Sequence, residues 1–158
     1  MVNHGSEGER ILQTKIGSKN KASAFYDKQL LNYLNPYMRE FILKQEMVFI
    51  ATADSKGECD CSFRAGKQGF VRILNEKTLL CPEYRGNGVM ASMGNILGNS
   101  HIGMTFIDFF KNTIGLHVNG KAKIVENDEL LADETRTSVA NNTQERRGRS
   151  RALDIHNG

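Results

Sequence analysis

The stretch MVFIATADSKGECDCSFR at residues 47–64 decides the fold class of this chain. Residues 47–53 are a short apolar run of the kind found in strands, and residues 54–57 have the composition of a tight turn. Residues 58–64 then alternate between polar and apolar side chains, as a half-buried strand does. The pattern predicts a β-hairpin.

Four further strand patterns and two helical regions follow or precede this hairpin. The expected strands cover residues 70–74, 78–81, 101–109 and 114–125, and helical spacing of apolar residues covers residues 25–45 and 90–97. We expect Pro82 to end the strand at residues 78–81, because proline donates no hydrogen bond to a ladder. Six short strands joined by tight turns favour a mainly β fold, an antiparallel β-barrel with flanking helices, over a βαβ sheet.

The two ends of the chain lack this patterning. Residues 1–24 are rich in Gly, Ser, Lys, Asn and Glu, which predicts a flexible N-terminal segment before a domain at residues 25–134. Residues 135–158 are a polar tail with a basic cluster, ERRGRSR, at residues 145–151. We interpret this tail as a solvated terminus, and binding of nucleic acid through it as the less favoured alternative.

Composition excludes several classes of protein. The chain has 158 residues and no apolar run near the roughly 20 that span a bilayer, so no membrane association is expected. The N-terminus lacks the apolar stretch of a signal peptide, which makes the cytoplasm the expected location. Three cysteines in such a chain predict no disulfide framework, and their spacing offers no metal site.

One group of residues has the chemistry of an anion site. Arg72 lies among apolar residues of a strand, where its planar guanidinium suits a phosphate. Arg85 and Asn87 lie in a Gly-rich turn, and Ser92 lies in the first turns of the helix that follows. Free amides and the helix dipole favour an anion there. Alternatively, Arg72 pairs with a carboxylate and Arg85 is solvated.

No catalytic acid, base or nucleophile stands out. The histidines show no metal spacing, and no Ser/His/Asp or Cys/His order is apparent. Asp108 lies between apolar neighbours, and we expect it to be paired within the structure rather than to act in catalysis.

An ordered set of short stretches resembles the pyridoxamine 5′-phosphate oxidase-like FMN-binding split-barrel family. The stretches are FIATAD at 49–54, SFRAG at 62–66, GFVRIL at 69–74, TLLCP at 78–82, YRGN at 84–87, SMGNI at 92–96, FIDF at 106–109 and LHVNGKA at 116–122. The resemblance implies a six-stranded antiparallel Greek-key split barrel that forms a homodimer, with FMN in a groove at the dimer interface. It assigns the FMN phosphate to Arg72, and less securely to Arg85, Asn87 and Ser92. By analogy, Arg64 and Phe70 flank the same groove.

The resemblance is incomplete at the C-terminus. The Arg/His-bearing segment that grips substrate in true pyridoxamine 5′-phosphate oxidases is not recognisable, so synthesis of pyridoxal phosphate is not expected. Apolar periodicity stops after residue 134, which predicts that the chain is truncated or altered where relatives have a further strand. The leading hypothesis is an FMN-dependent oxidoreductase acting on a small-molecule substrate or electron donor. The alternative is a non-catalytic flavin- or haem-binding split-barrel protein, and the spacing alone does not separate FMN from a deazaflavin or haem.

Overall fold

The computed structural model describes residues 4–84, 88–126 and 149–156. The chain divides into two compact units, Met1–Asn32 and Tyr33–Gly158, and each is described by itself. No helix among the described residues has both the length and the apolar character needed to cross a bilayer.

The first unit consists of two helices, α1 (Glu7–Ile16) and α2 (Lys19–Gln29). Ser6 caps α1 by accepting a hydrogen bond from the Glu9 amide, and Gly17 ends it in the left-handed conformation (φ 71°). The Tyr26 hydroxyl ties the helices together, because it donates to Glu9 (2.7 Å) and accepts from the Gln13 amide (2.9 Å).

These helices correct the prediction of a flexible segment over residues 1–24. Sequence reasoning weighed composition and missed the local capping signals at Ser6 and Gly17, which favour helix without any apolar core. Neither helix has a buried residue, as the composition had suggested. The domain boundary also moves from residue 25 to residue 33, because α2 runs through the predicted boundary.

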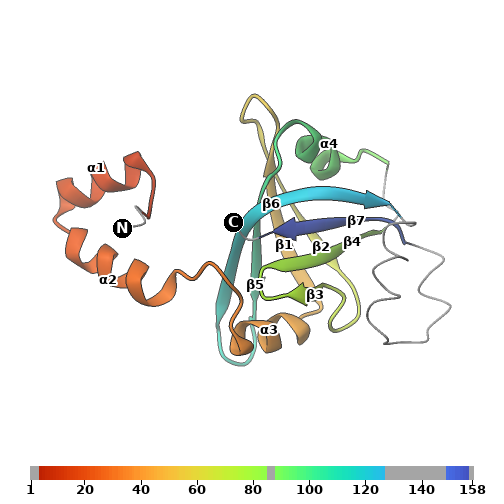
Figure 1. Ribbon diagram of the computed structural model, residues 1–158, viewed down its shortest axis with the longest axis horizontal. Coiled ribbons are helices and arrows are strands. Elements are labelled where there is room, and N and C mark those ends of the chain that lie inside the picture. The colour runs from red at the N-terminus through yellow and green to blue at the C-terminus, as the bar shows by residue number, and fades with distance from the viewer. Residues whose placement is uncertain (1–3, 85–87, 127–148, 157–158) are drawn as a thin grey trace. The chain divides into compact units, whose positions relative to one another are not determined.

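The second unit is a curved, seven-stranded antiparallel sheet with two short helices (Figure 1). Strand order is β2-β1-β5-β6-β7-β4-β3. The elements are α3 (Pro36–Leu43), β1 (Met47–Ala53), β2 (Cys59–Ala65), β3 (Arg72–Asn75), β4 (Thr78–Tyr84), α4 (Ala91–Gly98), β5 (His101–Ile107), β6 (Gly115–Glu126) and β7 (Arg149–His156). The predicted mainly β antiparallel fold with flanking helices is therefore confirmed, with seven strands rather than six.

The seventh strand corrects the prediction of a missing C-terminal strand. β7 lies between β6 and β4, where it pairs antiparallel with both. Leu153 and Ile155 are fully buried in the core. The polar tail predicted for residues 135–158 is thus wrong for residues 149–156; residues 127–148 lie outside the described residues. The apolar pattern of this strand consists of Leu153 and Ile155 alone, which is too short to predict a strand from the sequence. Pairing with the neighbouring strands stabilises it instead.

The register of β7 also gives part of the basic run a place in the sheet. Arg151 lies opposite Glu83 of β4 and opposite Glu126 of β6. Because these positions pair within the ladder, this part of the basic run belongs to the sheet.

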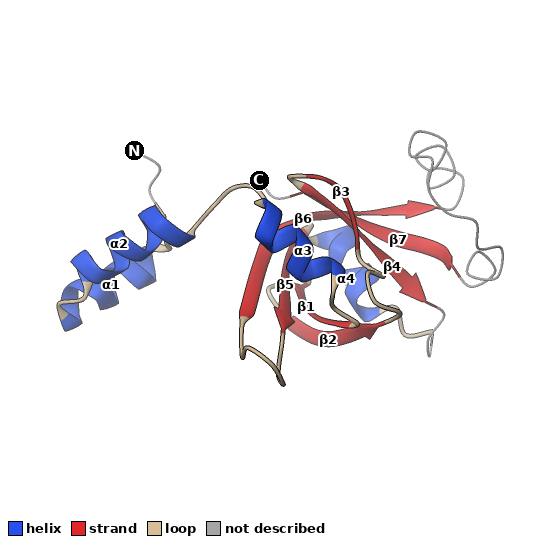
Figure 2. Cartoon of the chain, turned by 90° about the horizontal axis from the view of Figure 1, so that it is seen from below, coloured by secondary structure: helices blue, strands red, loops and turns tan. Residues whose placement is uncertain are grey.

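The core lies inside the curve of the sheet. Alternate residues of β1 and β5 are buried, as expected for strands with one face covered. α3 and α4 lie at opposite ends of the curved sheet (Figure 1 and Figure 2). Asn35 caps α3 by accepting from the Met38 amide, with Pro36 at the first helical position.

Replacing Leu153 tests whether β7 is part of the core. We expect Leu153→Ala to lower the free energy of unfolding by about 2–5 kcal/mol, because it leaves a cavity at a fully buried position. Urea unfolding measures the change. Leu97→Ala, at an exposed position on α4, is the control and should change stability by less than about 0.5 kcal/mol. A Leu153→Ala variant as stable as the parent protein would contradict the placement of β7.

Candidate functional site

An ion pair links two strands that lie far apart in the sheet order. β2 and β3 are the two edges of the sheet, and four strands separate β2 from β4. Arg64 on β2 nevertheless donates from Nε to Glu83 Oε2 on β4 at 2.9 Å. Both side chains are largely buried, with exposed fractions of 17% and 16%. The sheet therefore curls until β2 faces β4, and this pair spans the opening between them.

Strand β2 directs different chemistry to its two faces. Asp60, Ser62 and Arg64 are half-buried, whereas the intervening Cys59, Cys61 and Phe63 are exposed. The alternation follows from the pleat, which sends successive side chains to opposite sides. One face of β2 thus carries a polar cluster, and the other is thiol-bearing and apolar.

The polar cluster includes Ser92 from the first turn of α4. Arg64 Nη1 donates to Ser62 Oγ (2.9 Å), and Arg64 Nη2 approaches Ser92 Oγ (3.4 Å). The two serine hydroxyls lie 3.2 Å apart, and Ser92 donates to Asp60 Oδ2 (3.3 Å). The guanidinium is thereby held against the start of α4.

The start of α4 supplies further hydrogen-bond donors. Met90, the residue before the helix, has φ 59°, and no side chain caps the helix among the described residues. Such first amides have no partner within the helix, and the helix dipole favours negative charge there. Asn95 fixes α4 on β1, because its Nδ2 donates to the buried Thr52 hydroxyl at 3.1 Å.

The structure brings together only part of the predicted site. Arg64 and Ser92 meet in the cluster, and Arg72 is half-buried on β3, opposite Leu80 of β4. Arg85 and Asn87 lie outside the described residues.

Phe70 lies in the hydrophobic core. A Cβ on Gly66 would come within 2.7 Å of its ring, so this glycine makes room for it. Phe70 therefore has a packing role, and contact with a flavin stays a prediction.

Sequence reasoning missed Asp60, Ser62 and Glu83. The two-residue spacing of Asp60, Ser62 and Arg64 on one strand was a usable signal for the first two, since it places all three on one face. Glu83 gave no such signal, because its contact with Arg64 depends on the curl of the whole sheet.

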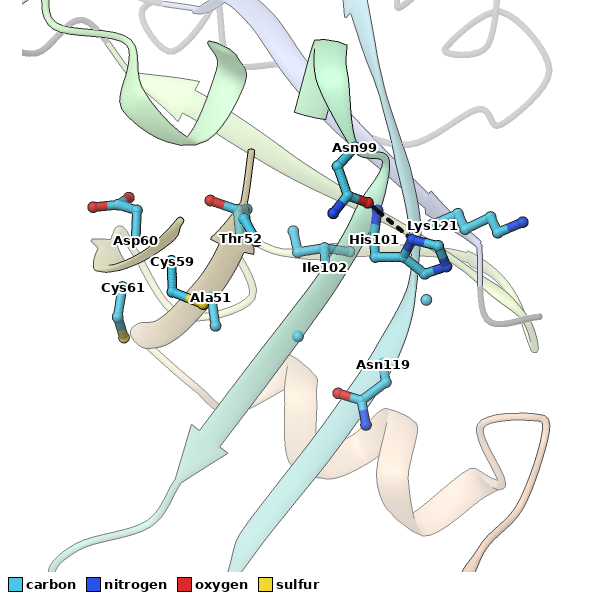
Figure 3. Close-up of a pocket in the computed structure, with 13 residues that line it drawn as sticks. Ala51, Thr52, Cys59, Asp60, Cys61, Asn99, His101, Ile102, Asn119 and Lys121 are labelled. Atoms are coloured by element: carbon cyan, nitrogen blue, oxygen red, sulfur yellow. Dashed lines mark hydrogen bonds between the residues drawn. The ribbon is translucent and has the colours of Figure 1, made fainter. Parts of the chain in front are cut away.

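A groove of about 710 Å³ lies on the outer face of the sheet, over β1, β2, β5 and β6 (Figure 3). Small residues form much of its surface, among them Ala51, Ala53 and Gly103. The Cys59 and Cys61 side chains lie at one side, on β2 (Figure 3). Asp60 also lines the groove, but its carboxylate bonds Ser92 on the opposite face of β2 from these thiols, so the groove and the polar cluster lie on different faces of the sheet. Its volume is within the range of sites that hold drug-sized ligands.

Polar side chains stand at the other side of the groove. His101, Asn119 and Lys121 line it from β5 and β6, and Asn99 precedes β5. Asn99 Oδ1 accepts from the His101 amide (3.2 Å) and lies 2.9 Å from His101 Nδ1 (Figure 3). If Nδ1 carries the proton, this contact leaves Nε2 as an acceptor.

Asp108 has the structural role expected of it, with different partners. Its carboxylate accepts hydrogen bonds from the amides of Phe110, Lys111 and Asn112 at 3.0–3.2 Å. These backbone donors, the Lys111 amide foremost, hold the pKa of Asp108 below its usual value. The residue shapes the β5–β6 turn and pairs with none of the candidate arginines in the described contacts.

The reactivity of the cysteines tests which thiols are exposed and which is buried. Burial raises the pKa of Cys81 to about 12, so this thiol stays protonated and shielded at pH 8, whereas Cys59 and Cys61 are exposed. We expect a thiol reagent such as DTNB to titrate two of the three thiols in the native protein and the third only after unfolding. Cys61→Ser should lower the native count to one. Three fast-reacting thiols in native protein would contradict the burial of Cys81.

Comparison with known proteins places this chain in a family. The family model described as pyridoxamine 5′-phosphate oxidase matches residues 34–156. A comparison with curated proteins finds no significant match.

Several solved structures share the fold. HupZ of Group A Streptococcus is 24% identical, with a TM-score of 0.56 over 78% of this chain and 88% of that one. A putative pyridoxamine 5′-phosphate oxidase of Lactobacillus delbrueckii is 16% identical, with a TM-score of 0.57 over 81% and 93%. HutZ, the haem storage protein of Vibrio cholerae, is 15% identical, with a TM-score of 0.53 over 79% and 90%. From the match of the family model to most of its length, the chain belongs to the pyridoxamine 5′-phosphate oxidase family.

Proposed function

We propose that this protein binds FMN and acts as a flavin-dependent oxidoreductase on a small-molecule substrate or electron donor. The observation that carries the proposal is the meeting of Arg64 and Ser92 at the start of α4, which no side chain of the described residues caps. A guanidinium beside free helix amides is the chemistry that recognises a phosphate group. Membership of the family supports a flavin as the molecule that carries it.

The phosphate of FMN would lie at the first turn of α4. Arg64 supplies N–H donors, and the helix amides supply the rest of the shell. Arg72, Arg85 and Asn87 are proposed as further phosphate ligands on the family resemblance. The groove and the polar cluster lie on opposite faces of β2, so the groove is a separate candidate surface for a planar ring.

The groove suits a planar ring system. Its small side chains leave room for a flat ligand, and its polar side offers His101 and Asn119 for hydrogen bonds. When bound, FMN supplies the transfer of electrons. The protein residues orient the ring and restrict its contact with water. We propose no proton-transfer residue.

We further propose that the protein is a homodimer with the flavin at its interface. The outer face of the sheet carries exposed apolar side chains at Met47, Phe49 and Phe63, and Phe49 lies directly opposite Phe63. This face adjoins the groove through Ala51 and Cys61. Exposed apolar patches commonly mark interfaces, and a two-fold dimer uses one such patch on both copies. A second copy would cover the face and close the groove.

Haem binding is the second candidate, and His101 in the groove is the observation that favours it. Imidazole is a common axial ligand of haem iron, and HutZ, which shares the fold, is a haem storage protein. An absorption spectrum separates the two candidates, because flavin and iron-bound haem absorb in different regions.

Titration with FMN and with riboflavin tests the proposed function. We expect about one FMN per chain and weaker binding of riboflavin, because a charge-assisted phosphate contact contributes roughly 1.5–3 kcal/mol. Arg64→Lys should weaken FMN more than riboflavin, since lysine lacks the planar fork. Fluorescence quenching measures both affinities, and Lys56→Ala, in the exposed β1–β2 turn, is the control. Equal loss of both ligands would indicate a structural arginine, and a folded protein that binds neither would exclude the proposal.

Sedimentation velocity tests the dimer. We expect the parent protein to sediment as a dimer and Phe63→Asp to sediment as a monomer, because a carboxylate at this exposed site would be buried unpaired in the interface. Tyr37→Asp alters an even more exposed aromatic residue, on α3, and should leave the dimer intact. A monomeric parent protein, or a dimer that tolerates Phe63→Asp, would contradict this interface.

A further inference from the structure

Glu83 is an acidic residue in a site proposed to bind an anion. Its carboxylate lies 2.9 Å from Arg64 Nε, with both side chains largely buried. Asp60 is a second carboxylate in the same cluster, bonded to Ser92. Arg64 therefore offers the cluster little uncompensated positive charge. What it can offer a phosphate is the direction of its N–H groups.

The contacts of Arg64 show how that direction is set. Nε donates to Glu83, Nη1 donates to Ser62 Oγ and to the Phe63 carbonyl oxygen (3.2 Å), and Nη2 faces Ser92. A planar guanidinium has one N–H on Nε and two on each Nη atom. In the described contacts, the Nε and Nη1 groups are used within the protein, and one N–H of Nη2 is left for a ligand. The bond to Glu83 fixes the plane of the group, so that Nη2 points to the start of α4.

We propose that Glu83 is a positioning residue that makes the site selective for phosphorylated over unphosphorylated flavin. This inference rests on the proposed function and adds a residue to it. Glu83 acts through Arg64 and does not touch the phosphate. Its reach matters to this role, because a shorter side chain cannot keep the 2.9 Å contact across the opening between β2 and β4. Its charge matters less, because a neutral amide oxygen also accepts from Nε.

Two other roles for Glu83 make different predictions. A purely structural ion pair would affect stability and leave the preference between the two flavins unchanged. A carboxylate that only competes with phosphate for Arg64 would make FMN bind more tightly whenever the negative charge is removed, and would matter little while the charge is kept.

Two variants separate reach from charge. Glu83→Asp keeps the charge and shortens the side chain by one methylene, whereas Glu83→Gln keeps the length and removes the charge. The ratio of riboflavin to FMN dissociation constants is measured for the parent protein and both variants. We expect Glu83→Asp to lower this ratio about tenfold, as for loss of one charge-assisted hydrogen bond, and Glu83→Gln to keep or raise it. Glu40→Ala, which removes the exposed carboxylate paired with Lys44 on α3, is the matched control.

The Nε–H resonance of Arg64 gives a readout that needs no flavin. We expect a slowly exchanging signal in the parent protein and in Glu83→Gln, and a weakened or lost signal in Glu83→Asp. If Glu83→Asp folds too poorly for titration, the test uses the parent protein and Glu83→Gln alone. These two must then show the same protected signal, and its loss in Glu83→Gln would contradict the proposal.

The outcomes separate failure of the role of Glu83 from failure of the proposed FMN binding. If the parent protein prefers FMN and Glu83→Asp prefers it equally, the role of Glu83 is overturned and the proposed function stands. Loss of the preference in Glu83→Gln but not in Glu83→Asp would assign the effect to charge and would also overturn positioning. If the parent protein binds neither flavin, the proposed function fails, and a selectivity role for Glu83 fails with it.

Discussion

The ion pair between Arg64 and Glu83 is the contact on which the candidate site depends. It joins β2, at one edge of the sheet, to β4, next to the other edge, and so spans the opening of the curled sheet. Burying both charges costs several kcal/mol per ion, and mutual attraction offsets this only when further hydrogen bonds satisfy the groups. Ser62 and Ser92 supply such bonds to Arg64. The pair thus links closure of the sheet to the placement of α4, which contributes Ser92.

The alternation of side chains along β2 explains how one strand serves two surfaces. Its inner positions hold the polar cluster, and its outer positions supply the thiols of the groove and Phe63 of the apolar face. A shift of one residue in the pairing of β2 with β1 would exchange the two sets. The register Phe49 to Phe63 therefore determines both where an anion can bind and where another chain can dock.

Local patterns predicted most of the fold and only part of the site. The hairpin at residues 47–64, the helix after Asn35 and the helix carrying Ser92 are set by turns, caps and periodicity within a few residues of each other. β7 was missed because its stability comes from two neighbouring strands distant in sequence, while its own apolar pattern is only Leu153 and Ile155. The partner of Arg64 was missed for the same reason: the contact with Glu83 exists only once five strand pairings have curled the sheet. At the N-terminus a local signal was overlooked. Caps at Ser6 and Gly17 favour a helix in a segment whose composition suggests flexibility.

The stability of the ligand-free protein explains why an anion site contains an acidic residue. An arginine on the covered side of β2 would be a largely buried, uncompensated charge whenever the ligand is absent, and such a charge strongly destabilises a fold. Glu83 removes that cost and uses only Nε, which leaves the approach of Nη2 to Ser92 in place. The ligand then adds contacts at Nη2 and at the amides of α4 without displacing the ion pair. The site gives up some electrostatic attraction for the phosphate, and in return the guanidinium has a fixed direction before the ligand arrives, so that less conformational freedom is lost on binding.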